Sequence, residues 1–199
     1  LGAFALSRKR LWIKKYINIL VVITMFFSGG LIPTFLIVRN VGLYDTRLAL
    51  MLPSLISTYN LIVLRTAFYA YPDSLEEAAT IDGATDFQIL FKLVIPLTKA
   101  TMAVILLFYA VTRWNDWFQA AIYLRQRAKY PLQLYLREVL INSNTESMMS
   151  GASAGQDTLA MSESIKYATV MVSTLPILIV YPFLQKYFVK GVMIGAVKG

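Results

Sequence analysis

Residues 76–84 of this sequence read EEAATIDGA, and they join two strongly apolar stretches. Residues 48–69, before them, read LALMLPSLISTYNLIVLRTAFY, and residues 93–112, after them, read LVIPLTKATMAVILLFYAVT. Each stretch is close to the roughly 20 residues that an α-helix needs to cross a bilayer. A link that only connected two spans would not need Glu76, Glu77, Asp82 and a glycine. We therefore predict that this link docks onto another protein.

The composition indicates a membrane protein. Of the 199 residues, 57% are hydrophobic and 15% are charged, and the mean hydropathy is +0.59. Soluble domains average roughly 45–50% apolar and 25% charged residues. The basic residues behind the net charge of +8 flank the apolar runs. Membrane topology explains them better than nucleic-acid binding, so we expect a lipid bilayer and no nucleic acid as partner.

The sequence excludes much catalytic chemistry. It contains no cysteine and no histidine, which removes disulfides, thiolate or imidazole metal sites and Cys/His nucleophiles. It also lacks the G-x-x-x-x-G-K-[ST] pattern of a P-loop. We therefore expect no catalytic residue, no metal and no cofactor on this chain.

Four apolar runs predict the fold class, an all-α polytopic membrane protein with four transmembrane helices. They are Ile17–Val38, Leu48–Tyr69, Leu93–Thr112 and Ile165–Leu184. We treat residues 1–199 as a single transmembrane domain. Its first residue is a leucine and LGAFAL looks like the end of a span, so we expect the N-terminal part of the protein to be missing.

Basic residues predict the sidedness of the chain. The first loop carries Arg8, Lys9, Arg10, Lys14 and Lys15, and the end of the chain carries Lys186, Lys190 and Lys198. The positive-inside rule places both on the cytoplasmic side, which makes the EEAATIDGA link and a tail at residues 185–199 cytoplasmic. Residues 113–164 become an extracytoplasmic segment. Its second half, NSNTESMMSGASAGQDTLAMS, predicts an exposed loop.

The link itself predicts a helix, a turn and a second helix over residues 72–92. Ser74 and Glu77 have the spacing of a capping box, and Thr85 and Gln88 repeat it. Gly83 lies between them, where the first helix must end. The simpler alternative is that these residues only cap helices and form a turn.

The same residues resemble a known signature. Glu77-Ala78-Ala79, Gly83 and then Leu93-x-Ile95-Pro96 match the E-A-A-x₃-G-x₉-I-x-L-P pattern of ABC-importer permeases, with two apolar exchanges. The WNDW segment and the closing QKYFVKGVMIGAVKG are similar to carbohydrate-importer permeases of the MalG type, including those for acidic oligosaccharides such as alginate. Such permeases have six spans, so the resemblance implies that about two are absent here.

The resemblance implies that the link is a coupling helix on an ATP-driven importer of the cell inner membrane. Two copies of a cytoplasmic ATPase would bind ATP and Mg, and a second permease subunit and an extracytoplasmic substrate-binding protein would complete the assembly. The implied ATPase-docking residues are Glu76, Glu77, Ala78, Ala79, Asp82 and Gly83. Tail residues implied to contact the ATPase are Lys190, Gly191, Gly195 and Lys198.

Two further sets of residues are predicted to meet the substrate or its binding protein. The loop formed by Gly151, Ala152, Ser153, Ala154 and Gly155 would enter the binding protein. Aromatic and amide side chains suited to a sugar path are Tyr59, Asn60, Tyr109, Trp114 and Asn115, with packing between helices as the alternative.

Other functions stay open at this point. The motif is shared with ABC importers for amino acids or peptides. A secondary transporter or a membrane-embedded enzyme would be expected to carry carboxylates inside its spans. None of the four runs contains Asp or Glu, which argues against both.

Overall fold

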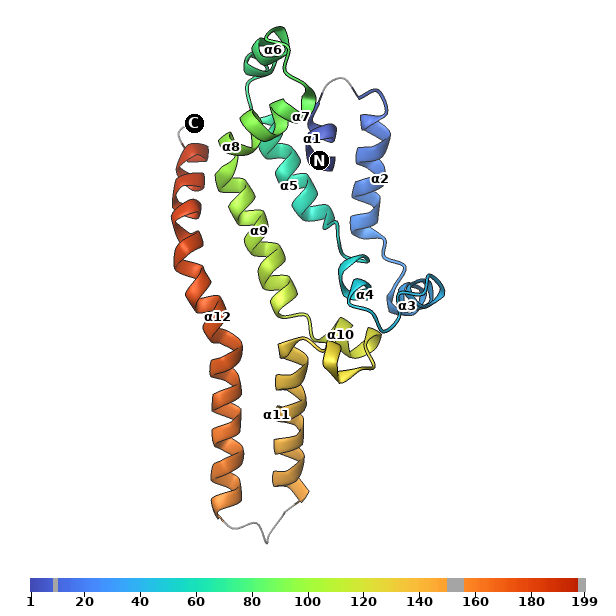
Figure 1. Ribbon diagram of the computed structural model, residues 1–199, viewed down its shortest axis with the longest axis vertical. Helices are drawn as coiled ribbons and strands as arrows, with labels where there is room; N and C mark the ends of the chain where they lie inside the picture. Colours follow the sequence, from blue (N-terminus) through green and yellow to red (C-terminus); the bar gives the residue numbers. More distant parts are fainter. Residues whose placement is uncertain (9–10, 150–155, 197–199) are drawn as a thin grey trace. The chain divides into compact units, whose positions relative to one another are not determined.

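The computed structural model describes residues 1–8, 11–149 and 156–196, and these residues form helices and connecting turns without a strand (Figure 1). The prediction of an all-α chain is confirmed for this described part. Its elements, including the π-helix η1 and the 3₁₀-helix η2, are α1 Gly2–Ser7, α2 Lys14–Phe26, α3 Leu31–Asn40, α4 Leu48–Met51, α5 Thr58–Tyr69, α6 Asp73–Ile81, α7 Asp86–Gln88, η1 Ile89–Val94, α8 Ile95–Leu97, α9 Lys99–Trp114, α10 Phe118–Tyr123, η2 Arg127–Lys129, α11 Leu132–Met149 and α12 Gln156–Ala196.

The chain forms two compact units. Unit 1 contains Leu1–Thr34, Ser54–Phe108 and Leu184–Gly199, and unit 2 contains Phe35–Pro53 and Tyr109–Phe183.

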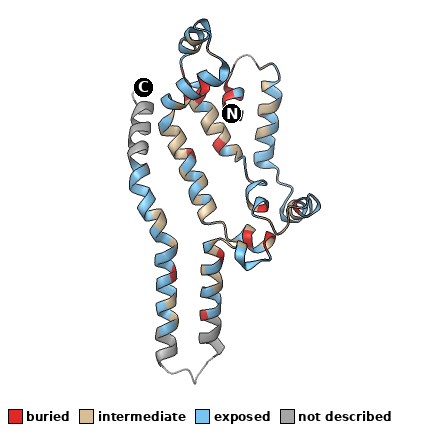
Figure 2. Cartoon of the chain, viewed as in Figure 1, coloured by how far each residue is buried: buried red, intermediate tan, exposed pale blue. Residues whose placement is uncertain are grey.

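Unit 1 has a core where α1, α5 and η1 meet. The buried residues of this core are Ala3, Phe4, Phe68, Ile89, Leu90 and Val94 (Figure 2). The rings of Phe4 and Phe68 meet edge to face with their centroids 6.3 Å apart, a favourable geometry for an aromatic pair. Arg65 on α5 donates to the Asn18 side chain on α2 at 2.5 Å. The short helix α1 is thus fixed to α5 through its apolar face.

Unit 2 has two small cores around α10. One contains Val38, Ala49 and Tyr123, and the other contains Ala120, Leu124 and Leu134. Phe35 stacks on Tyr123 with 6.1 Å between the ring centroids. Both cores therefore hold α10 against its neighbours in unit 2.

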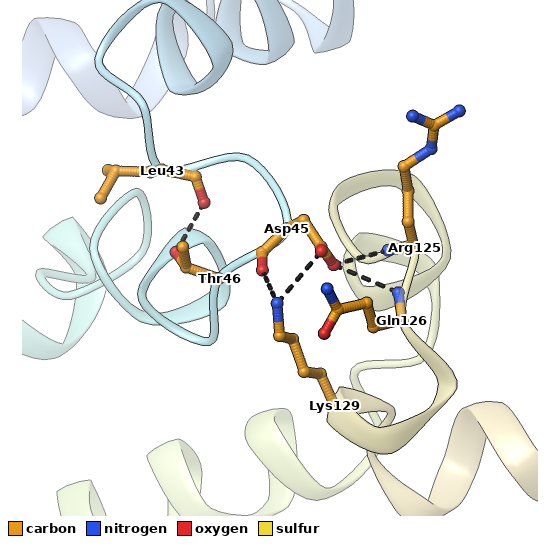
Figure 3. A network of polar contacts seen from close by, with 6 residues as sticks. All are labelled: Leu43, Asp45, Thr46, Arg125, Gln126 and Lys129. Atoms are coloured by element: carbon orange, nitrogen blue, oxygen red, sulfur yellow. Dashed lines mark hydrogen bonds and ion pairs between the residues drawn. The ribbon is translucent and has the colours of Figure 1, made fainter.

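A polar network, which we name the Asp45 clasp, ties the loop after α3 to the segment after α10 (Figure 3). The Asp45 carboxylate accepts hydrogen bonds from the backbone N–H groups of Arg125 at 2.9 Å and Gln126 at 3.2 Å. Lys129 Nζ donates to the same carboxylate at 3.0 Å and to the Asp45 carbonyl at 2.5 Å. The Asp45 N–H donates to the Tyr123 carbonyl at 2.9 Å. Asp45 has φ 58°, the only positive φ of a non-glycine residue in the described chain.

The predicted span Ile17–Val38 is divided into two helices. Helix α2 ends at Phe26, α3 begins at Leu31, and the two are bent by 115°. Ser28, Gly29 and Gly30 lie between them, and Gly30 has φ 83°, a conformation that ends a helix and that glycine adopts without strain.

The predicted span Leu48–Tyr69 is also divided, into α4 and α5. Pro53 follows α4 closely, and proline cannot donate the backbone hydrogen bond that would continue the helix. Ser57 then caps α5, because its side chain accepts a hydrogen bond from the Asn60 N–H. Polar capping residues in the middle of an apolar run therefore restart the helix at Thr58.

The predicted span Leu93–Thr112 begins within η1 and continues through α8 into α9. The helical segment Asp86–Leu97 and helix α9 are bent by 86° at Thr98. The described chain has one helix long and apolar enough to cross a membrane, Met161–Phe183 within α12, and up to three if each of the two bent pairs counts as one span. The count of four spans stays a prediction.

The second half of the outer segment differs from the predicted loop. Helix α11 runs to Met149 and α12 begins at Gln156, so the loop prediction is wrong for the residues that these helices cover. The Ser143 hydroxyl donates a hydrogen bond to the Leu140 carbonyl at 3.1 Å, and the Ser162 hydroxyl donates one to the Ser143 carbonyl at 3.1 Å. Serine hydroxyls satisfied in this way are compatible with a helix, which a reading of composition alone does not show.

Candidate functional site

The link between α5 and α9 begins with α6, and we name residues 72–92 the coupling loop after the coupling helix that the resemblance implies. Pro72 is the N-cap, with φ −63° and ψ 126°, and no side chain caps this end. The predicted capping box of Ser74 and Glu77 is therefore wrong, because the helix starts at Asp73, too early for Ser74 to cap it. Asp73 and Glu76 in the first turn face the positive end of the helix dipole instead.

Gly83 ends α6 as predicted. It has φ 80°, and an added Cβ would meet no atom within 4 Å, so the requirement for glycine here is conformational. The Ala84 N–H donates to the Ala79 carbonyl at 2.9 Å and the Gly83 N–H to the Thr80 carbonyl at 3.0 Å. These two hydrogen bonds are those of a Schellman motif, which satisfies the last carbonyls of α6.

The second predicted capping box is confirmed. The Gln88 N–H donates to the Thr85 hydroxyl at 3.4 Å, and the Thr85 N–H donates to the Gln88 side chain at 2.9 Å. Helix α7 then passes without a gap into η1 and α8, where Pro96 follows the π-helical turn. Caps on both sides of Gly83 thus fix the conformation of the loop locally.

The predicted docking residues divide by exposure. Glu77, Ala78, Asp82 and Gly83 are exposed, whereas Ala79 packs against the core of unit 1. Glu76 forms an ion pair with Arg8, which precedes α2. The exposed group is the part of the prediction that remains accessible to a partner.

Two apolar side chains extend this exposed group. Ile81 is 85% exposed and Phe87 is 66% exposed. Neither residue is among the site residues predicted from the sequence. Large apolar side chains in a polar link between membrane helices are the signal that could have identified both, because exposed apolar residues gathered on one segment mark interaction sites.

A pocket of about 950 Å³ lies between α1 and the coupling loop, all within unit 1. Its charged lining consists of Arg8, Asp73, Glu76, Glu77 and Asp86, and its apolar lining includes Phe4, Leu11, Ile81, Phe87 and Leu90. The pocket therefore has an apolar wall and an excess of carboxylates. These side chains suit contact with a surface that is apolar and basic.

Arg8 is the basic group of this pocket. Its guanidinium carbon lies 4.3 Å from the centroid of the Phe4 ring, a cation–π contact. Burial lowers the pKa of Arg8, and the charges of Asp73 and Asp86 act against that shift. Burial also raises the pKa of the neighbouring Tyr71 phenol. At physiological pH Arg8 is charged and Tyr71 is neutral.

The predicted sugar-path residues fall in both units. Tyr59, which is 55% exposed, and the buried Asn60 belong to unit 1, while Tyr109, Trp114 and Asn115 belong to unit 2. Trp114 donates its indole N–H to the Ser173 carbonyl on α12 at 2.9 Å. Ser173 lies in the turn before Pro176, where proline weakens the hydrogen bonds of the helix. Trp114 therefore has a packing role, and a path along these residues stays a prediction.

The other predicted sites are only partly described. Residues Gly151–Gly155 lie outside the described residues, as does Lys198. The backbone at Lys190, Gly191 and Gly195 is the end of α12, continuous with the helix that contains Met161–Phe183. Within the residues searched, no group of three or more carboxylate, histidine or cysteine side chains could hold a metal ion.

Comparison with known proteins identifies the family. Residues 1–194 match the family described as "Binding-protein-dependent transport system inner membrane component". The chain belongs to this family. The resemblance to ABC-importer permeases drawn from the EAA signature is thereby confirmed.

Relatives and a solved structure support the assignment. The chain is 47% identical over 200 residues to the polygalacturonan/rhamnogalacturonan transport system permease protein YtcP of Bacillus subtilis, covering 100% of this chain and 69% of the relative. It is 30% identical to the lactose transport system permease protein LacG of Rhizobium radiobacter, covering 98% and 65%. A bacterial ABC transporter involved in the import of the acidic polysaccharide alginate contains a similar chain, with a TM-score of 0.82 and 36% identity over 94% of this chain and 66% of that one. The chain thus spans about two thirds of the length of these proteins.

Proposed function

We propose that this chain is the permease subunit of an ATP-driven, binding-protein-dependent importer of oligosaccharides, and that α6 is its coupling helix. The family and the relatives named for sugar transport support this function over import of amino acids or peptides. The relatives named for polygalacturonan and alginate carry acidic sugars, so acidic oligosaccharides are the substrate class we propose. The chain itself would change conformation during transport and would not catalyse ATP hydrolysis.

The observation that carries the proposal is the exposed group on the coupling loop. Glu77, Ala78, Ile81 and Phe87 are accessible on a segment whose caps hold it in one conformation. A preformed helix with a small face lets a partner surface approach closely and loses little conformational entropy on binding. Such an element can transmit the closure of an ATPase pair to the helices that continue from it, through η1 and Pro96 into α9.

The proposed assembly contains a second permease subunit, two ATPase subunits that hold ATP and Mg, and an extracytoplasmic substrate-binding protein. The proposed site of the whole is the bacterial cytoplasmic membrane, with the coupling loop and the tail at residues 185–199 inside and residues 113–164 outside. The distribution of Lys and Arg supports this sidedness, and the family description supports the membrane location.

Co-purification tests the proposal. The tagged full-length protein, isolated from its native membranes in mild detergent, should bring with it an ATPase that carries a P-loop. Glu77→Lys should lower the recovered ATPase by about tenfold, because a reversed charge at the centre of an interface costs more than 1.4 kcal/mol. The matched control is Glu163→Lys on α12, an exposed carboxylate on the side predicted to be extracytoplasmic.

Two results would contradict the proposal. One is a folded protein that is purified without any bound ATPase. The other is an equal loss of ATPase with Glu163→Lys and Glu77→Lys. Thermal unfolding of each variant shows whether the fold itself is retained.

A further inference from the structure

The ion pair between Arg8 and Glu76 joins two segments that the sequence assigns to different tasks. Arg8 belongs to the basic loop that sets membrane topology, and Glu76 belongs to the coupling helix. Their side chains are 14% and 24% exposed, whereas the pair of Arg127 and Glu138 has side chains 70% and 31% exposed. A pair shielded from water is screened less by salt and tolerates the loss of one partner poorly.

Arg8 also contacts the body of unit 1 directly. Its guanidinium lies over the Phe4 ring, and Phe4 packs edge to face against Phe68 of α5. The Ser7 hydroxyl donates to the Phe4 carbonyl at 2.7 Å, which holds the last turn of α1 just before Arg8. The basic end of the ion pair is therefore fixed to the body of unit 1.

Lys14, from the same basic loop, makes a second contact with this body. Its Nζ lies 4.6 Å from the centroid of the Tyr69 ring at the end of α5, and it donates to the Ser7 carbonyl at 3.4 Å. Lys15, the next residue, is exposed, and no side-chain contact links it to the coupling loop in the described structure. Arg8 and Lys15 thus count equally in the positive-inside rule but have different contacts. Lys15 can therefore serve as the matched control for Arg8.

The coupling helix contacts this body at two of the predicted docking positions. Among its six predicted docking residues, Ala79 packs on the core and Glu76 pairs with Arg8, while the others are exposed. Arg8 Nε and Nη2 have no hydrogen-bond partner in the described structure, so the guanidinium holds Glu76 without the two parallel hydrogen bonds of a bidentate pair. A contact of this kind fixes distance more than orientation.

We propose that Arg8 is a positioning residue that braces the coupling helix α6 against α1 and α5 through Glu76. Glu76 then faces inward and does not contact the ATPase, and the docking charge is Glu77 alone. When a bound partner moves α6, the brace carries that motion to α1. The role of α6 in a transporter rests on the function proposed above. The contact between Arg8 and Glu76 does not depend on that function.

The contact is tested first, by cross-linking in the full-length protein. The 199 residues contain no cysteine, so an Arg8→Cys and Glu76→Cys pair in this chain reports one distance. In native membranes a short bis-maleimide should join this pair efficiently. A Lys15→Cys and Glu76→Cys pair should react about tenfold less, because its first residue is exposed and points to no partner on α6. Equal cross-linking of both pairs would overturn the brace.

The role is tested next, by exchanging charges in the assembled transporter. Arg8→Glu should keep the bound ATPase within about twofold, since Glu77 is untouched, while ATP hydrolysis per bound ATPase falls about fivefold or more because two carboxylates now repel. Arg8→Glu combined with Glu76→Arg should restore hydrolysis to within about twofold of the original protein. Lys15→Glu makes the same charge change in the same loop and should leave hydrolysis within about twofold.

These results separate the brace from the proposed function. Loss of ATPase on Glu76→Gln as complete as on Glu77→Lys would overturn the brace, because Glu76 would then be a docking residue. Absence of rescue in the exchanged pair would overturn it as well. If Arg8→Glu fails to accumulate in the membrane, Arg8→Lys replaces it. ATP hydrolysis should then lie between that of the original protein and the fivefold lower value expected for Arg8→Glu, because lysine keeps the charge but lacks the guanidinium plane over Phe4. Failure of the docking proposal would instead appear as undiminished ATPase binding by Glu77→Lys, whatever the result of the cross-linking experiment.

Discussion

The Asp45 clasp and the Arg8–Glu76 brace both hold a carboxylate with a basic residue from a distant part of the sequence, but they do so differently. Asp45 accepts two hydrogen bonds from backbone N–H groups as well as one from Lys129 (Figure 3). The Glu76 carboxylate pairs with the side chain of Arg8. Backbone donors have fixed positions, whereas an arginine side chain can change rotamer. The clasp therefore fixes a loop in one conformation, and the brace ties a helix that can still move.

The largest expected loss of stability comes from breaking the clasp. Asp45→Ala removes three hydrogen bonds to the carboxylate and places alanine at φ 58°. We expect the temperature of unfolding in detergent to fall by roughly 5 °C or more. Asp45→Asn is the matched control, because asparagine tolerates this φ and can still accept from both N–H groups. Equal losses in the two variants would show that charge alone holds the loop.

The next effect tests whether the coupling loop is fixed by its own backbone. Gly83→Val places a β-branched residue at φ 80° and should lower the free energy of unfolding of the loop by about 1–2 kcal/mol. Gly83→Asn should cost less. Hydrogen exchange of the amides from Thr80 to Ala84 measures the local change. Unaltered exchange in Gly83→Val would mean that the Schellman motif does not limit opening there.

A smaller effect is expected from the second cap. Thr85→Ala removes the hydroxyl that accepts from the Gln88 N–H and should destabilise α7 by about 1 kcal/mol. Thr85→Ser retains that hydroxyl and should stay close to the original protein. Hydrogen exchange at Gln88 distinguishes the two variants. If both exchange alike, the Gln88 side chain rather than the hydroxyl maintains the start of α7.

The smallest effect is the dependence of the clasp on pH. The hydrogen bond from the Arg125 N–H is the largest effect on Asp45 and lowers its pKa, while burial, the next largest, raises it. The hydrogen bonds from Lys129 and the Gln126 N–H lower the pKa further, so it lies below its usual range. A carboxylate with a lowered pKa adds stability above its unfolded pKa of about 3.9 and loses it as pH falls through the folded value. The difference in unfolding temperature between the original protein and Asp45→Asn should therefore stay constant from neutral pH down to about pH 5 and shrink below about pH 4. A difference that shrinks between pH 7 and 5 would contradict this pKa.

Local features of the coupling loop could be predicted from the sequence. Gly83 and the Thr85–Gln88 box each depend on residues within a few positions, so spacing alone identified them. The start of α6 was missed because Pro72 competes with Ser74 for the same helix end. The break at Gly30 could not be located because hydropathy averages over the polar and glycine residues that interrupt a helix.

Contacts between distant segments could not be predicted. Lys129 and Asp45 are 84 positions apart, and Arg8 reaches Glu76 only because α1 packs on α5. A count of basic residues treats Arg8, Lys14 and Lys15 alike, although the structure gives each of them different neighbours. The tertiary arrangement decides which member of a charge run has a partner.

The π-helical turn η1 has a consequence for the helices on either side of it. A π-turn contains an additional residue relative to an α-turn, and each residue advances an α-helix by about 100° and 1.5 Å. If Ile89–Val94 changed to α-helical hydrogen bonding, α8 would rotate by roughly that angle relative to α7 without unfolding. The turn thus contains one additional residue at the point where the segment proposed to dock on the ATPase continues into a predicted span. Such a change would couple a shift along the helix axis to a rotation about it.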